Sequence, residues 1–123
     1  MNGYPARDRV LGSAAVVPAS QTDAPVSQEV PVTAGGSLNM VVAVKATAVT
    51  GTVDLKLQTA VSDSWVDVKA TTIAAPGYAY IRVNVQTTAD QAVLPLLGKV
   101  RVVATTGGGE DITVSNVWFF QNQ

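Results

Sequence analysis

Short runs of alternating apolar and polar residues follow one another along most of the chain, and turn residues separate them. Over residues 79–84, for example, Ala, Ile and Val alternate with Tyr, Arg and Asn. Successive side chains of a β-strand point to opposite faces, so this alternation predicts strands with one buried face. Pro76-Gly77 and Thr50-Gly51 are typical of the tight turns between such strands.

The composition favours strands over helices. The chain contains 22 Val and 13 Thr but only 7 Leu and 2 Glu, and β-branched residues prefer strands. Only residues 89–97 could form a turn of helix, and Pro95 would end it. We therefore expect eight strands, which cover residues 10–17, 26–32, 38–46, 52–59, 64–70, 78–86, 99–105 and 112–120.

A length of 123 residues suits one domain with a single core. Eight short strands without helices indicate an all-β fold, which we predict to be a single-domain antiparallel β-sandwich or jelly roll, with a barrel as the alternative. Residues 1–9 show no apolar period and are predicted to form an extended N-terminal arm. Residues 10–123 are predicted to form the β-sandwich domain.

Three local features follow from the same alternation. In the last strand the apolar phase changes near Ser115 and Asn116, which predicts a β-bulge. Residues 40–44 are apolar on both phases, which predicts a strand that is covered on one face by its own domain and on the other by something else. Residues 52–59 and 64–70 are expected to form a hairpin with Leu57 opposite Val66, and hence with the charge pairs Lys56–Asp67 and Asp54–Lys69.

The sequence predicts that the protein is not an enzyme and holds no cofactor or metal. It has no His and no Cys, which removes the usual bases, thiol nucleophiles and metal ligands. Asp54 and Asp67 could form a carboxylate pair, and Glu110-Asp111 could offer oxygen ligands to calcium, but neighbouring lysines and a solvated turn explain these groups more simply. The net charge of −1 and the shortness of the apolar runs predict neither a nucleic-acid nor a membrane partner.

The large apolar and aromatic residues predict a contact surface. Residues 117–120 are four bulky apolar residues in a row, and one face of a strand cannot bury all of them. Aromatic rings on the polar phase of a strand are typical of interfaces, or of carbohydrate-binding modules if Trp65, Tyr78 and Tyr80 lie exposed on one side. The predicted oligomer or partner interface comprises Met40, Val42, Trp65, Tyr80, Trp118, Phe119 and Phe120.

Three segments of the chain resemble a known class of protein. Residues 51–59 read GTVDLKLQT, residues 65–68 read WVDV, and residues 112–118 read ITVSNVW. These strings resemble small structural proteins of tailed bacteriophages, most closely the capsid decoration, or cement, proteins. The resemblance covers the second half of the chain. It implies a compact β-sandwich or jelly roll that forms a dimer or trimer on the outside of an icosahedral head and bridges capsomers.

This resemblance leads to an expected function. The chain would be a virion structural protein that binds the major capsid protein on the outer surface of the head and stabilises the assembled shell. From the residues themselves we expect Tyr4, Arg7 and Arg9 of the arm to contact the capsid, because guanidinium groups suit carboxylates. The alternatives are a neck, tail or fibre-base protein of the same kind of virus and a carbohydrate-binding β-sandwich module.

Overall fold

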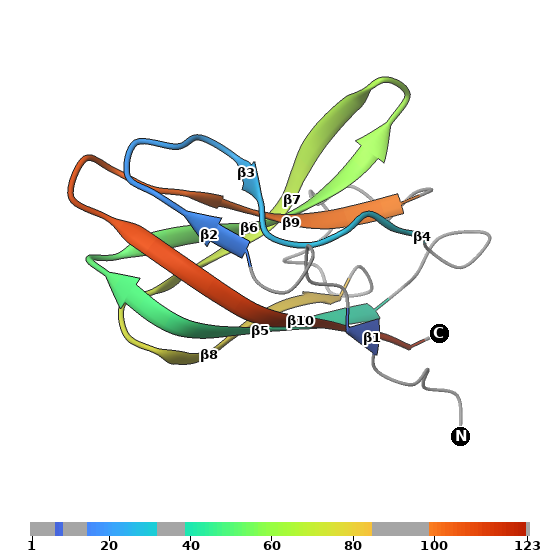
Figure 1. The fold of residues 1–123 in the computed structure, drawn as a ribbon. Coiled ribbons are helices and arrows are strands. Elements are labelled where there is room, and N and C mark those ends of the chain that lie inside the picture. Colours follow the sequence, from blue (N-terminus) through green and yellow to red (C-terminus); the bar gives the residue numbers. More distant parts are fainter. Residues whose placement is uncertain (1–6, 9–14, 32–38, 85–98, 123) are drawn as a thin grey trace.

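The protein is an all-β sandwich of two antiparallel sheets, as Figure 1 shows. The computed structural model describes residues 7–8, 15–31, 39–84 and 99–122. These residues form ten strands and contain no helix. The predicted fold class is therefore confirmed.

The first sheet, here called the β10 sheet, has a long central pair of strands. β10 (Asp111–Asn122) pairs with β5 (Asn39–Thr50), and β5 pairs with β8 (Gly77–Asn84). The other edge of β10 is shared by two short strands, β1 (Arg7–Asp8) and β2 (Ala15–Val17). Part of the predicted arm, Arg7–Asp8, thus adds an edge strand to the sheet.

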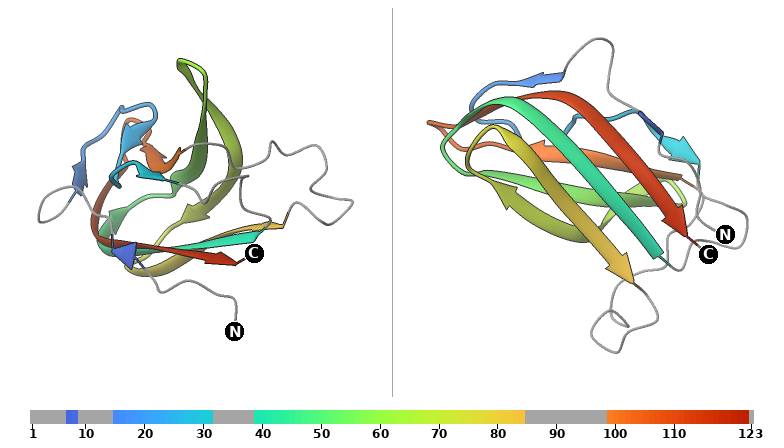
Figure 2. Two further views of the ribbon diagram at one scale, coloured as in Figure 1. Left: turned by 90° about the vertical axis from the view of Figure 1, so that its right-hand side faces the viewer. Right: turned by 90° about the horizontal axis from the view of Figure 1, so that it is seen from below.

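The second sheet, the β9 sheet, is built in the same way. β9 (Lys99–Thr105) pairs with β6 (Val53–Val61), and β6 pairs with β7 (Ser64–Ile73). The other edge of β9 is shared by β3 (Ala24–Pro25) and β4 (Val30–Pro31). The β6–β7 hairpin extends away from the body of the sandwich (Figures 1 and 2).

The order of pairing is that of a jelly roll. If β1 and β2 count as one edge strand and β3 and β4 as another, the first strand pairs with the last, the second with the seventh, the third with the sixth and the fourth with the fifth. The chain is thus one long antiparallel hairpin, which is rolled up so that β5 meets β10 and β6 meets β9. Among the sandwich and jelly-roll alternatives, this nested order selects the jelly roll.

The space between the sheets is filled by the inward phase of every long strand. Its largest side chains are Phe119, Met40, Leu55, Leu57, Ile81 and Ile112, and valines fill most of the rest. Burial of one such side chain contributes about 1.5–3 kcal/mol. The alternation predicted from the sequence therefore produces one continuous core.

The six long strands match their predicted positions, whereas of the predicted strand over 26–32 the described residues form only β4 at Val30–Pro31, and β3 precedes it at Ala24–Pro25. Pro25 and Pro31 lack an N–H group, and between them only Ser27 forms an isolated bridge. Val26 N donates to Val102 O, and Val102 N donates to the Ser27 Oγ atom at 2.9 Å. A side-chain oxygen thus takes the place of a backbone carbonyl at this edge. The helix candidate at 89–97 lies outside the described residues.

The predicted register of the hairpin over residues 53–73 is wrong. The turn is Ser62–Asp63, with Ser62 at φ 57°, so β6 continues to Val61. Lys56 lies opposite Ala70, and a bulge at Val68 changes the register. The Lys56 Nζ atom still lies 3.3 Å from Asp67 Oδ2, because a long side chain can reach a diagonal neighbour. Asp54, however, lies opposite Thr72.

The bulge predicted in the last strand is confirmed. The register between β10 and β5 shifts on both sides of Val114, so the inward phase changes from Ile112 and Val114 to Val117 and Phe119. This shift sets which residues of the second half of β10 point outward. Those residues form the surface described next.

Candidate functional site

The outward side chains of β10, β5 and β8 form a grid of three rows on the outer face of the β10 sheet. Cross-strand register defines each row, since directly opposite residues point to the same side of a sheet. The nine positions are here called the aromatic face. Its rows are Asn116–Lys45–Tyr78, Trp118–Ala43–Tyr80 and Phe120–Val41–Arg82.

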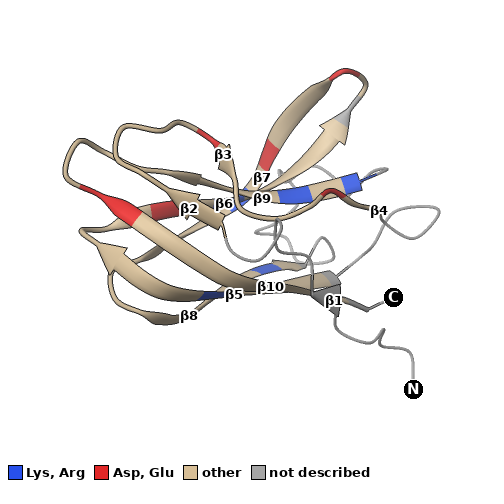
Figure 3. Cartoon of the chain, in the orientation of Figure 1, with Lys and Arg blue, Asp and Glu red and all other residues tan. Residues whose placement is uncertain are grey.

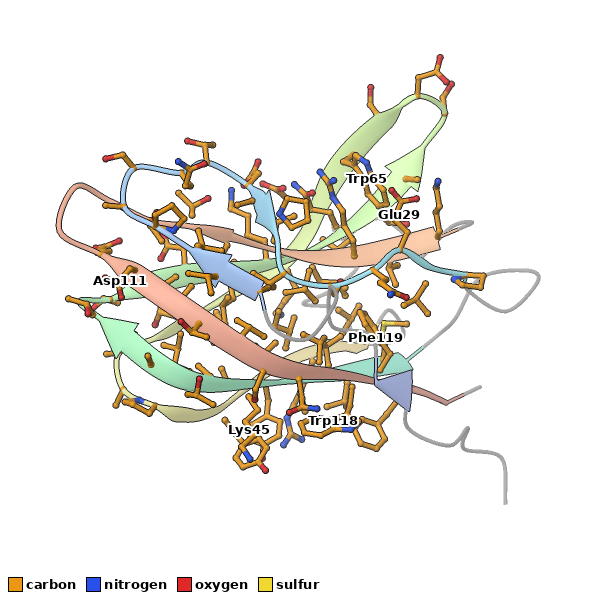
Figure 4. The ribbon with its side chains drawn as sticks, in the orientation of Figure 1. Glu29, Lys45, Trp65, Asp111, Trp118 and Phe119 are labelled. Atoms are coloured by element: carbon orange, nitrogen blue, oxygen red, sulfur yellow. The ribbon has the colours of Figure 1, made fainter. Side chains whose placement is uncertain are left out.

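Four of the nine positions of this face are aromatic. Tyr78, Tyr80 and Phe120 are 54%, 50% and 41% exposed. The Tyr78 and Tyr80 rings are nearly parallel, at 11° with centroids 6.3 Å apart, and the Trp118 ring lies 6.2 Å from Tyr78 at 31°. Figure 4 shows Trp118 and Lys45 on the outer side of the sheet, away from the core. Neighbouring exposed rings form a contiguous apolar patch, which is typical of interaction sites, whereas single exposed apolar residues are common on any protein surface.

The centre of the face is a small side chain. Ala43 lies between Trp118 and Tyr80 in the middle row and is buried. In the strand over 40–44, Met40, Val42 and Val44 face the core and Ala43 is buried on the outer side, while Val41 is half-buried, so cover of the outer side by a partner stays a prediction.

Three residues of the predicted interface belong to the core instead. Met40, Val42 and Phe119 are at most 2% exposed and lie between the two sheets. Phe119 points inward because it alternates with Trp118 and Phe120 along β10, and Figure 4 shows it on the inner side. Their expected contact with a partner is therefore wrong for this fold. Trp118, Phe120 and Tyr80 do lie together on the outer face.

Trp65 lies on the other sheet and is separated from Tyr78 and Tyr80. It is half-buried in β7, with the guanidinium carbon of Arg101 4.3 Å from its ring centre and Lys99 Nζ 5.9 Å away. The line of three exposed rings that a carbohydrate-binding surface would need from Trp65, Tyr78 and Tyr80 is not formed. The third ring beside Tyr78 and Tyr80 is that of Trp118.

The expected capsid-contact arm is described only in part. Arg7 lies in β1 opposite Phe119, and Asp8 lies opposite Trp118. Tyr4 and Arg9 lie outside the described residues. The arm segment that is described therefore borders the row of the aromatic face that contains Trp118 and Tyr80.

A hydrogen-bonded network occupies the outer side of the β9 sheet. Arg101 Nε donates to Gln58 Oε1 at 2.9 Å, and Gln58 Nε2 donates to Asp67 Oδ1 at 2.8 Å. Lys56 Nζ lies 3.4 Å from Asp23 and 3.3 Å from Asp67. The Gln58 hydrogen bond first, and then Lys56, lower the pKa of the Asp67 carboxyl. A general acid needs a raised pKa, so Asp67 suits a salt bridge better than catalysis.

This network predicts a specific pH dependence. Because the pKa of Asp67 is lowered in the folded state, its ionised carboxylate stabilises the fold at pH values above the usual carboxyl pKa. This contribution is lost as the pH falls through the folded-state pKa. The pKa of Lys56 is raised, chiefly by its hydrogen bond to Asp67, so its contribution is lost only in strong alkali. We expect the fall in unfolding free energy between pH 6 and pH 3, measured by urea titration, to be smaller in Asp67→Asn than in the parent. An equal fall in both would contradict the assignment to Asp67.

The other candidate sites of the sequence do not assemble. Glu110 Oε1 accepts a hydrogen bond from Gly107 N at 2.7 Å, so this carboxylate orders the β9–β10 turn. The described residues contain no cluster of three or more metal-ligating side chains. A hollow of about 420 Å³ is lined by Pro25, Ser27, Gln28, Glu29 and Arg101, but Arg101 is already engaged by Trp65 and Gln58.

Lys45, Tyr78 and Arg82 are members of the face that the sequence did not single out as interface residues. Alternation places Tyr78, Tyr80 and Arg82 on the outward phase of one strand, which is a usable signal. Their neighbours on β5 and β10 come from distant parts of the chain, so only the strand order brings the nine positions together.

No protein-family model matches this chain, and no curated protein is significantly similar to it in sequence.

In the part of the chain that the structure describes, no helix has the length and apolar character needed to cross a membrane.

Proposed function

We propose that this protein is a virion structural protein that binds the outside of an assembled phage head as an oligomer and stabilises it by bridging capsomers. The observation that carries the proposal is the aromatic face, where Tyr78, Tyr80 and Phe120 are exposed and Trp118 lies half-buried beside Tyr78. Aromatic residues are enriched at protein interfaces, and Trp and Tyr are frequent among the few residues that dominate the binding energy. The resemblance of the sequence to decoration proteins supplies the identity of the partner.

The dimensions of the face suit the centre of an interface. The three strands of the face span about 10 Å across the sheet, and its three rows span four residues, or about 14 Å, along the strands. An interface commonly buries about 800 Å² on each partner, with a small cluster of dominant residues near its middle. The remaining area would come from residues around the face, including the neighbouring edge strand β1 and a second subunit.

The mechanism is selective binding of the assembled state. A ligand that binds only the assembled shell stabilises it by RT ln(1 + [L]/Kd), which is about 2.7 kcal/mol at a hundredfold excess over Kd. A head offers many equivalent sites, so moderate affinity at each site is sufficient. The jelly roll has many backbone hydrogen bonds and no cysteine, so its stability does not depend on a redox state.

The test is co-sedimentation of the protein with expanded heads that lack it, from the phage that encodes the chain. We expect saturation at a copy number set by icosahedral symmetry, with the oligomer as a dimer or trimer in sedimentation velocity. No binding to heads, together with binding to isolated necks, tails or fibres, would favour the alternative location in the same virion.

Tyr80→Ala should weaken binding to heads about tenfold, or ~1.4 kcal/mol, because it removes a half-exposed ring from the middle row. Val16→Ser is the matched control, since Val16 is a 68% exposed apolar residue of the same sheet but lies opposite Thr113, on the far side of the bulge. Equal weakening by both substitutions would place the contact elsewhere. Circular dichroism should show both variants folded.

A carbohydrate-binding role has one observation in its favour. Tyr78 and Tyr80 are exposed and nearly parallel, and aromatic rings of this kind can stack on sugars. A glycan array separates this role from the first, because a carbohydrate-binding module would bind defined glycans in the absence of heads. Binding that Tyr80→Ala removes on the array, with none to heads, would favour the carbohydrate-binding role.

A further inference from the structure

We infer that the surface bound by the aromatic face carries carboxylate groups, which pair with Lys45 and Arg82 around the aromatic rings. This inference rests on the proposed function and concerns the chemistry of the protein partner. It follows from the distribution of charge between the two sheets. Figure 3 shows the positions of the charged residues.

Two cations on the β9 sheet, Lys56 and Lys99, are matched by carboxylates of this chain. Lys56 contacts Asp23 and Asp67, and Lys99 forms a salt bridge with Glu29. These pairs satisfy the lysines within the molecule. Neither Lys56 nor Lys99 therefore needs a carboxylate from another molecule.

The aromatic face is different. Lys45 lies 5.9 Å above the Tyr78 ring, and Arg82 is exposed at the end of β8. Among the described side chains, no carboxylate forms a salt bridge with either cation. Asp111 lies at the other end of β10, beyond the bulge. Asp8 stands at the β1 edge of the sheet, two strands from Lys45 and three from Arg82.

The two cations lie at opposite ends of the face. Lys45 is in the row of Asn116, and Arg82 is in the row of Phe120, with the Trp118–Ala43–Tyr80 row between them. Four residues along the strands and one strand across separate them by about 14 Å at the backbone. Partner carboxylates at a similar spacing would meet both cations while the rings cover apolar surface between them. Exclusion of water by the rings strengthens such pairs.

Two other occupants fit less well. A second copy of the same face would bring another lysine and another arginine, and the nine positions of the face include no carboxylate to pair with them. A nucleic acid would meet aromatic rings, but only two cations, on a chain with a net charge of −1. An acidic protein surface matches both the rings and the charges.

The test measures binding of Lys45→Glu and Arg82→Glu to heads at low and high salt. We expect each to weaken binding at least about tenfold in 50 mM NaCl, and the parent to lose affinity as salt rises while the variants lose less. Lys69→Glu makes the same charge change on an exposed residue of β7, in the other sheet, and should bind as the parent does. All variants are compared for secondary structure and oligomeric state.

The outcomes separate this inference from the proposed function. If Tyr80→Ala weakens binding to heads while both charge reversals bind as the parent does, the carboxylate partner is wrong and the head-binding role stands. If the parent does not bind heads, the proposed function fails first. Binding of a fluorescent single-stranded oligonucleotide that Lys45→Glu and Arg82→Glu abolish would assign the face to nucleic acid and overturn the inference.

Discussion

Phe119→Ala should lower the free energy of unfolding by about 3–5 kcal/mol. The ring is 2% exposed and lies between the two sheets, on the strand that pairs with β5 along one side and with β1 and β2 along the other. Truncation removes the transfer energy of a whole ring and leaves a cavity that the surrounding strands fill only in part. The measurement is urea or guanidinium unfolding, with a lower midpoint and an unchanged slope.

Phe120→Ala is the matched control for this prediction, since it removes the same ring one residue further along. Phe120 is 41% exposed on the aromatic face, so we expect a change in unfolding free energy below about 1 kcal/mol. Its effect should instead appear in binding to heads. Equal destabilisation by the two substitutions would mean that β10 has a different register from the one described.

The fold could be predicted because each long strand is specified by a local sequence pattern. Alternation, β-branched residues and turn residues placed the six long strands within a few residues of their positions. The short edge strands were harder, because β3 lies before the predicted strand over 26–32, only Val30–Pro31 of that strand is regular, and the Ser27 hydroxyl replaces a backbone acceptor. Such a replacement depends on β9, which lies some 75 residues further along the chain.

The register of the β6–β7 hairpin shows where charge patterns mislead. Pairing Lys56 directly opposite Asp67 satisfies the charges, yet the chain forms a two-residue turn at Ser62–Asp63 and a bulge at Val68. The Lys56–Asp67 salt bridge forms between diagonal neighbours instead. An exposed pair of this kind contributes only a fraction of a kcal/mol, so it does not determine the register. The turn and the buried leucines determine the pairing.

The candidate site was predicted only in part, for a topological reason. The sequence shows that residues 117–120 are too apolar for one face, but the side on which Phe119 lies depends on the bulge next to Val114. Trp65 and Tyr80 are both on outward phases, and only the sheet order shows that they lie on different sheets. Long-range pairing therefore decides which outward residues form a surface.

Thr106→Val should destabilise the fold by about 2–3 kcal/mol, although the two side chains have nearly the same shape. The Thr106 hydroxyl is buried, donates to Pro18 O at 2.6 Å and accepts from Gln21 N at 3.0 Å. Thr106 N also donates to Gln21 O, so this residue fastens the segment between β2 and β3 to the end of β9. Valine loses two hydrogen bonds, each with a net contribution of about 1–1.5 kcal/mol.

Thr106→Ser isolates the hydroxyl from the methyl group. Serine keeps both hydrogen bonds, so we expect it to cost less than about half as much as valine in the same urea titration. Hydrogen exchange adds a local readout, because the Gln21 amide should lose protection in Thr106→Val and keep it in Thr106→Ser. The segment over 18–23 joins the two sheets, so its release should weaken the pairing of both short edge strands beside it, β2 with β10 and β3 with β9. A larger loss in serine than in valine would show that packing of the methyl group, and not the hydroxyl, holds this segment in place.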